Sequence, residues 1–164
     1  MKGLTRKTIV TAAALLIVFP TLAAADPAAN KVTAARVLLE KVGQGKFDHL
    51  EEIYGPGYVN RAFPHDLTLE EDNASTRTVR AAIPELKISI DHIVGEGDLV
   101  AVHWRATGAN TVAAPPFPGT GRSVVIDGIS LFRFQHDRIV EEWSTYDNLA
   151  TMEQLGMLPA APPR

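Results

Sequence analysis

Side chains that could do chemistry alternate along two late segments that read as strands, residues 123–134 and 139–146. If the turn between them is Gln135-His136-Asp137, with Asp137 left-handed, then Phe134 pairs with Arg138 and Arg133 lies opposite Ile139. That register puts the following residues on one face: Asp127, Ile129, Leu131, Arg133, Glu141, Trp143, Thr145 and Asp147. The face combines carboxylates, a guanidinium and an indole, groups that can transfer protons or hold a small molecule.

The segments that must position this face follow a simple order, helices first and strands afterwards. Apolar residues at helical spacing, each run followed by glycine or proline, predict helices over 30–42, 47–54 and 68–83. Residues 58–67 are expected to form an irregular connection. A period of two then predicts strands over 86–91, 99–107, 123–134 and 139–146, with a terminal helix over 148–155. This order indicates an α+β domain with one antiparallel sheet.

The composition excludes several classes of protein. The chain has 164 residues, of which 46% are apolar and 21% charged, which fits one globular domain and not a mainly disordered chain. Lys and Arg number 16 against 19 Asp and Glu, so no nucleic-acid partner is expected. The absence of cysteine excludes disulfides, thiolate catalysis and cysteine-ligated metals, and the histidines have no metal-ligand spacing.

The first 25 residues have the three parts of a secretory signal peptide. Basic residues open the chain, the apolar run 12–19 follows, and Ala23 and Ala25 occupy the small-residue positions of a cleavage site. An uncleaved membrane anchor is the alternative, although the apolar run is short for a membrane span. We therefore expect cleavage after Ala25, a periplasmic or secreted domain over 26–158 without a stable membrane anchor, and a loose tail over 159–164.

Four segments carry a family resemblance: residues 97–104, 119–122, 129–134 and 139–147. In the last of them, Ile139-Val140-Glu141-Glu142-Trp143 precedes Asp147, and Gln154-Leu155-Gly156-Met157-Leu158 follows. Together they resemble the SnoaL-like polyketide cyclases (ester cyclases) of the nuclear transport factor two-like superfamily. The resemblance covers residues 85–158 well and 47–63 weakly. It implies a cone-shaped α+β barrel, with N-terminal helices packed in a curved antiparallel sheet around a pocket.

The resemblance also implies a reaction that needs neither metal nor cofactor. In the characterised cyclases an aspartate after this strand removes a proton from a carbon next to carbonyl groups, and Asp147 holds the matching position. An apolar pocket raises the pKa of a carboxylate and makes it a stronger base. Arg133 would stabilise the developing enolate. With Arg133, the candidate substrate-binding residues are Trp143, Trp104, His103 and Leu131.

Each of these residues also has a purely structural interpretation. Asp147 stands where it could cap the terminal helix, and Arg133 could pair with Glu141 across the hairpin. The two tryptophans could belong to the core, and His103 could be a hydrogen-bonded strand residue.

Two classes of function therefore stay open. The first is an exported enzyme that acts on a small carbonyl-containing or cyclic apolar compound by aldol closure, isomerisation or hydrolysis. The second is a non-catalytic module that binds a small ligand or mediates assembly. Export and the replacement of two common family histidines by Arg61 and Asn110 separate the chain from a strict polyketide cyclase. A homodimer is expected through an apolar outer face formed by Phe132, Phe134, Val140 and Tyr146.

Overall fold

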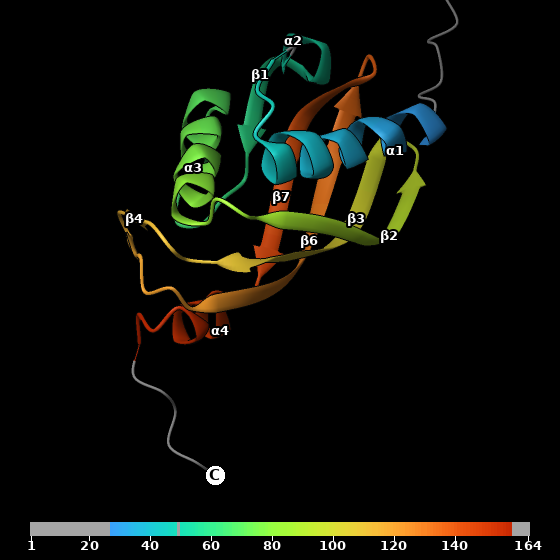
Figure 1. Cartoon of the computed structure of the whole chain (residues 1–164). Helices are drawn as coiled ribbons and strands as arrows, with labels where there is room; N and C mark the ends of the chain where they lie inside the picture. Colours follow the sequence, from blue (N-terminus) through green and yellow to red (C-terminus); the bar gives the residue numbers. More distant parts are fainter. Residues whose placement is uncertain (1–26, 49, 159–164) are drawn as a thin grey trace, which may run out of the picture.

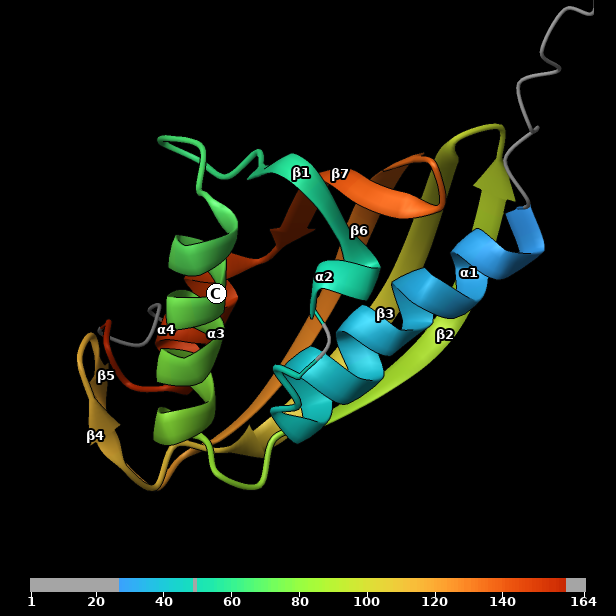
Figure 2. The ribbon, with the colours of Figure 1, turned by 90° about the horizontal axis from the view of Figure 1, so that it is seen from above.

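A strongly curved sheet forms one wall of the molecule, and helices lie against one of its faces (Figures 1 and 2). The computed structural model describes residues 27–48 and 50–158. The predicted signal peptide and the predicted tail lie outside these residues.

The helices match the predicted segments closely. Helix α1 (Pro27–Arg36) continues into the π-helix η1 (Val37–Val42), and the short α2 (Leu50–Ile53) precedes the first strand. Thr68 caps α3 (Leu69–Ala82) in a capping box with Glu71, and α4 (Asn148–Gln154) closes the domain. Within the described residues, none of the helices combines the length and the apolar character that crossing a membrane requires.

The main sheet has five strands in the order β1-β7-β6-β3-β2. Their bounds are β1 (Tyr54–Asn60), β2 (Lys87–Glu96), β3 (Leu99–Ala109), β6 (Ser123–Gln135) and β7 (Arg138–Tyr146). The loop between β3 and β6 contains a small ladder of β4 (Ala113–Ala114) and β5 (Phe117–Pro118). The predicted α+β class is confirmed, but the sheet is mixed, because β1 runs parallel to β7. The sequence did not predict β1, since Gly55-Pro56-Gly57 within it reads as a turn.

The β6–β7 hairpin differs from the predicted register by two residues. His136 and Asp137 both have positive φ, 50° and 61°, so the turn has two residues and Gln135 pairs with Arg138. An irregularity further along then leaves Val140 unpaired and puts Arg133 opposite Glu141. The predicted loop length was wrong. Because a shift of two residues preserves side-chain parity, the residues expected to share a face do share it.

That shared face looks outward, which corrects the sequence-based orientation. The core instead contains the alternate residues of β6, with Phe132 fully buried and Phe134 3% exposed, so they cannot form the predicted dimer face. The alternation along β6 did not settle which face is buried, because the residues that point inward also include Gly128 and Ser130. Gly128 makes room for an indole, since a Cβ there would lie 2.3 Å from the Trp104 ring.

Candidate functional site

Asp147 lies on the surface as the N-cap of α4. Its Oδ1 accepts a hydrogen bond from the Ala150 backbone N–H at 2.9 Å, and the residue is exposed. The expected inward orientation is therefore wrong, and the capping interpretation describes its geometry. A catalytic role for Asp147 stays a prediction.

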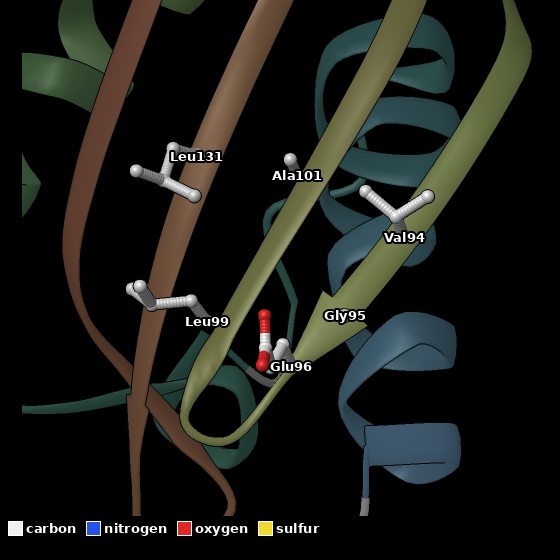
Figure 3. Close-up of a pocket in the computed structure, with 6 residues that line it drawn as sticks. All are labelled: Val94, Gly95, Glu96, Leu99, Ala101 and Leu131. Atoms are coloured by element: carbon white, nitrogen blue, oxygen red, sulfur yellow. The ribbon is translucent and has the colours of Figure 1, made fainter.

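Arg133, Trp143 and Leu131 also lie on the outer face of the sheet. The Arg133 Nε is 2.9 Å from Glu141 Oε2, its Nη1 is 3.3 Å from Asp98 Oδ2, and its guanidinium lies 5.7 Å from the centre of the Trp143 ring. Leu131 lines an open depression of about 410 Å³ (Figure 3). We call this depression the outer hollow; its lining is Val94, Gly95, Glu96, Leu99, Ala101 and Leu131.

His103 belongs to a polar group on the same outer face. Its Nε2 lies 3.3 Å from Asp127 Oδ1, and Asp91 completes a cluster with metal-ligand chemistry. The Arg105 guanidinium, however, lies 3.2 Å from Asp127 and 3.7 Å from Asp91. Because an arginine of the chain already pairs with both carboxylates, the cluster is better described as a surface ion-pair network than as a metal centre.

The positions that depart from the family pattern, Arg61 and Asn110, both have structural roles. Arg61 is an exposed residue that pairs with Glu141 and Asp66. Asn110 is fully buried, where its Nδ2 donates to the Ala82 carbonyl at 3.0 Å and its Oδ1 accepts from the Gly119 N–H at 2.8 Å. It therefore anchors the loop that follows β3.

The inner side of the sheet contains a cavity of about 170 Å³, which we call the inner cavity. One wall is polar, formed by Lys41, Asn60, Asp72, Ser130, Glu142 and Ser144. The other residues around it are Val37, Leu38, Val42, Thr76, Ile88, Trp104 and Tyr146. Of the candidate residues named from the sequence, Trp104 is the one that lines this cavity.

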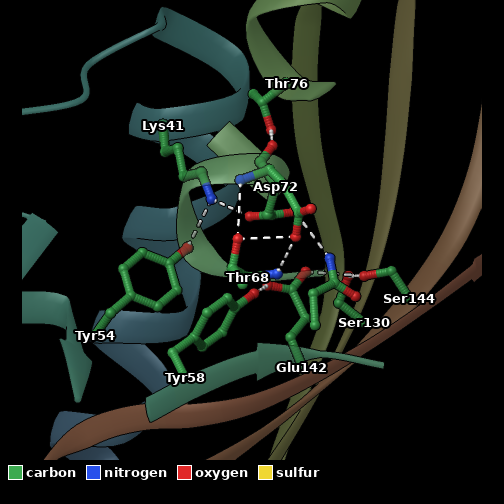
Figure 4. A network of polar contacts seen from close by, with 11 residues as sticks. Lys41, Tyr54, Tyr58, Thr68, Asp72, Thr76, Ser130, Glu142 and Ser144 are labelled. Atoms are coloured by element: carbon green, nitrogen blue, oxygen red, sulfur yellow. Dashed lines mark hydrogen bonds and ion pairs between the residues drawn. The ribbon is translucent and has the colours of Figure 1, made fainter. Parts of the chain in front are cut away.

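A buried ion pair between Lys41 and Asp72 forms one half of the polar wall (Figure 4). Lys41, at the end of η1 and 2% exposed, donates to Asp72 Oδ2 and to the Tyr54 hydroxyl at 3.0 Å. Asn60 Nδ2 donates to the other oxygen, Asp72 Oδ1, at 2.8 Å. Asp72 stands in the first turn of α3, where the helix dipole stabilises a negative charge.

Glu142 forms the other half of the polar wall. It is the final acceptor in a chain of hydrogen bonds that all donate toward it (Figure 4). The Trp104 indole N–H, which can only donate, bonds Ser130 Oγ at 3.0 Å. Ser144 Oγ donates to Glu142 Oε1 at 2.9 Å, so the proton in the 2.7 Å contact between Ser130 and Ser144 comes from Ser130. Both carboxylate oxygens thus accept, because Tyr58 donates to Glu142 Oε2 at 2.8 Å.

Burial is the main reason why the pKa of Glu142 is raised above its ordinary value of 4.5, and the negative charge of Asp72 adds to the effect. Lys41, Tyr58 and Ser144 oppose this rise by favouring the charged form. Burial also raises the pKa of Tyr54 and of Tyr58 far above neutrality, so both phenols keep their protons. The site therefore places a proton acceptor beside hydrogen-bond donors and a paired ammonium group.

The raised pKa predicts a stability effect with a definite sign. The folded protein binds the Glu142 proton more tightly than the unfolded chain, so stability from this group is greatest below about pH 4.5 and falls as pH rises through the folded-state pKa. Glu142→Gln removes this dependence. We expect the unfolding free energy of the wild type, measured with urea relative to this variant, to fall as pH rises from about 4.5 through the folded-state pKa of Glu142 and to level off above it.

The neighbouring residue provides the control for that measurement. Hydrogen bonding from Arg61 lowers the pKa of Glu141, so its stabilising contribution is present above pH 4.5 and is lost as pH falls. Glu141→Gln should therefore change the pH dependence with the opposite sign. A wild-type stability that tracks Glu142→Gln at every pH would contradict the raised pKa.

Sequence reasoning missed Lys41, Asp72 and Glu142. One local signal was available, because Lys41 follows Val37 by four residues and Leu38 by three, which puts a charged residue on an apolar helix face. Asp72 read as an ordinary acidic residue of a first helical turn. Glu142 stood on the face of β7 that was taken as the outer one.

Fold and site together define the class: a curved α+β cone of the nuclear transport factor two-like type, with a partly polar cavity on the inner side of its sheet. The sequence profile of the SnoaL-like polyketide cyclases matches residues 32–155, and the chain belongs to that family. No curated protein matches significantly.

Solved structures agree with this fold. AclR from Streptomyces galilaeus, provisionally assigned as a hydroxylase, superposes with a TM-score of 0.74 at 19% identity over 84% of this chain and 87% of that one. A provisionally assigned SnoaL-like polyketide cyclase from Jannaschia sp. CCS1 gives 0.71 at 24% identity, over 81% and 95%. IdmH from Streptomyces antibioticus, provisionally assigned as a polyketide cyclase, gives 0.67 at 26% identity, over 77% and 98%.

Proposed function

We propose that this protein is an enzyme in which Glu142 removes a proton from a carbon next to a carbonyl group of a small molecule. The observation that carries the proposal is the buried Glu142 carboxylate, which is 7% exposed, lines the inner cavity and has a raised pKa. A base works best when its pKa lies near the working pH, and burial moves a glutamate in that direction. The similarity to provisionally assigned polyketide cyclases supports the same type of carbon-acid chemistry.

The other half of the polar wall suits the charge that this step creates. Proton removal leaves negative charge on the carbonyl oxygen, and that oxygen needs a donor. Among the described residues, Lys41 uses two of its three N–H donors, on Asp72 and Tyr54, so the third is available to the cavity that Lys41 lines. The base, the cation and the donors are all side chains of this chain. Protonated Glu142 then returns the proton. If the proton goes to the γ-carbon of an enone, the double bond shifts and an isomerisation is complete; if the enolate carbon attacks a second carbonyl, whose oxygen takes the proton, an aldol closure is complete.

We propose Glu142 as the base in place of Asp147. The two residues are close in sequence, but Asp147 is exposed and its Oδ1 is used as a helix cap. Glu142 has the two properties expected of the aspartate base, burial and a raised pKa. Comparing Glu142→Gln with Asp147→Asn separates the two assignments, because asparagine caps a helix about as well as aspartate does.

Solvent deuterium exchange tests this function without knowledge of the natural substrate. The protein is incubated in deuterium oxide with butanone, cyclohexanone, 1-tetralone and a three-ring ketone, and loss of the proton signal next to the carbonyl is followed by NMR. Exchange with at least one ketone that is faster with the wild type than with Glu142→Gln supports the proposal. Equal rates with both proteins for every ketone, together with saturable binding, would leave the non-catalytic binding module as the function.

Two further proposals concern where the protein works and in what form. We propose export, supported by the signal-like first 25 residues, and a homodimer formed through the outer hollow, whose lining is apolar apart from Glu96 and includes the 62% exposed Val94. The intact mass and the sedimentation equilibrium of protein recovered from the periplasm or medium test both. We expect a chain that begins at Asp26 and a dimer at micromolar concentration; a chain that retains Met1 or a monomer contradicts the respective proposal.

A further inference from the structure

We infer that the inner cavity selects an uncharged carbonyl compound with a single six-membered ring, and that it excludes fused multi-ring compounds. The inference rests on the proposed function, because it names the substrate class of the same site. It depends on three properties of the cavity: its volume, the arrangement of its walls and its charge.

Volume sets the upper limit. The inner cavity measures about 170 Å³, and a buried apolar cavity of about 150 Å³ holds one benzene molecule. Pockets for drug-sized ligands measure about 300–1,000 Å³. One ring with a carbonyl oxygen and a small substituent therefore fills the cavity, whereas a second fused ring either has to move the walls or projects past the exposed side chains of Ser144 and Tyr146, outside the cavity. The walls include Leu38 and Trp104, which are 4% and 9% exposed and belong to the core cluster, so such movement costs packing energy.

The walls set the orientation of the ring. Lys41 and Glu142 lie in the polar wall, while Val42, Ile88 and Trp104 provide apolar surface around the same space. A molecule with one polar edge and an apolar body satisfies both walls. Its carbonyl oxygen then lies toward Lys41, and the adjacent carbon toward Glu142.

The charges of the cavity exclude anions. Asp72 and Glu142 are two carboxylates against one ammonium group, and Lys41 is already paired with Asp72. Once Glu142 is ionised, the cavity carries a net negative charge, which repels a carboxylate ligand in a low-dielectric environment. The preferred ligand is therefore a neutral ketone or enone.

Binding of phenols, which resemble an enol in shape and polarity, tests the size limit. The two indole N–H signals in a proton–nitrogen NMR spectrum serve as reporters, because Trp104 lines the inner cavity and Trp143 lies on the outer face. We expect phenol to shift the Trp104 signal saturably and to leave the Trp143 signal in place. Three-ring 2-phenanthrol should bind at least about tenfold more weakly, although its larger apolar area would favour it on an open surface. Benzoate, of similar size but anionic, should leave the Trp104 signal in place.

Enlarged cavities provide the matched control. Val42→Ala and, as a milder alternative, Ile88→Val remove methyl groups from the apolar wall, and two-ring 2-naphthol should gain affinity in either variant relative to phenol. The inference is overturned if 2-phenanthrol shifts the Trp104 signal as strongly as phenol in the wild type, or if phenol does not shift it. This test and the test of Glu142 as the base can fail separately. Size selection without Glu142-dependent exchange contradicts the proposed function alone. Exchange of a three-ring ketone contradicts the size limit alone.

Discussion

Glu142→Gln is expected to lower the rate of deuterium exchange next to a carbonyl by about 10²–10⁴-fold, the usual contribution of a positioned general base. Glutamine has the same shape and can still accept hydrogen bonds from Tyr58 or Ser144, but it cannot take a proton at working pH. In the wild type the rate should rise with pH through the pKa of Glu142, above its ordinary value of 4.5, because only the ionised carboxylate acts as a base.

Asp147→Asn is the control for this prediction. It keeps the hydrogen bond to the Ala150 N–H and removes the acidity of the side chain, and we expect the exchange rate to stay within about twofold of the wild type. The opposite pattern, with exchange lost in Asp147→Asn and kept in Glu142→Gln, would return the role of base to Asp147. Near-ultraviolet circular dichroism checks that both variants are folded.

Asp72→Leu is expected to lower the free energy of unfolding by about 3–5 kcal/mol, because it leaves Lys41 as an unpaired buried charge. The double variant Lys41→Met with Asp72→Leu should recover most of this loss, since an apolar pair of similar size replaces a buried ion pair at little cost. Urea unfolding followed by circular dichroism measures both.

An exposed ion pair provides the matched comparison. Arg36 and Glu40 lie one turn apart, with an N–O distance of 3.3 Å and side chains that are 39% and 37% exposed. Glu40→Ala should therefore change the unfolding free energy by about 0.5 kcal/mol at most. If Asp72→Leu has an equally small effect, the Lys41 ammonium is not confined to the interior.

Local periodicity was enough to predict most helices and strands. The capping residue Thr68 and the terminating Pro84 bracket α3, and the alternating apolar residues of β3 and β6 identify long strands. These signals depend only on residues close together in the sequence, so they can be recognised without knowledge of the fold. Strand β1 could not be predicted in this way, because its pairing partner β7 lies some 80 residues later and its glycines suggest a turn.

The site was harder to predict because its contacts are long-range. Lys41 and Asp72 are 31 residues apart, and Tyr58 and Glu142 are 84 apart, so no spacing in the sequence brings them together. The orientation of β7 decides whether Glu142 or its neighbours face the core, and alternation alone left both choices open. Trp104, a candidate substrate-binding residue from the sequence, lines the inner cavity, but its part as a fixed donor depends on Gly128 and Ser130 beneath it.

The position of β1 at the margin of the sheet bears on the local stability of the site. This strand carries Tyr54, Tyr58 and Asn60, yet its ladder to β7 has only three registered pairs and is interrupted between Tyr54 and Val59. Strands bonded on both sides resist local separation more than a marginal strand does. We therefore expect β1 to separate from the sheet more readily than β3, β6 and β7, which keep Glu142 and its serine partners in place.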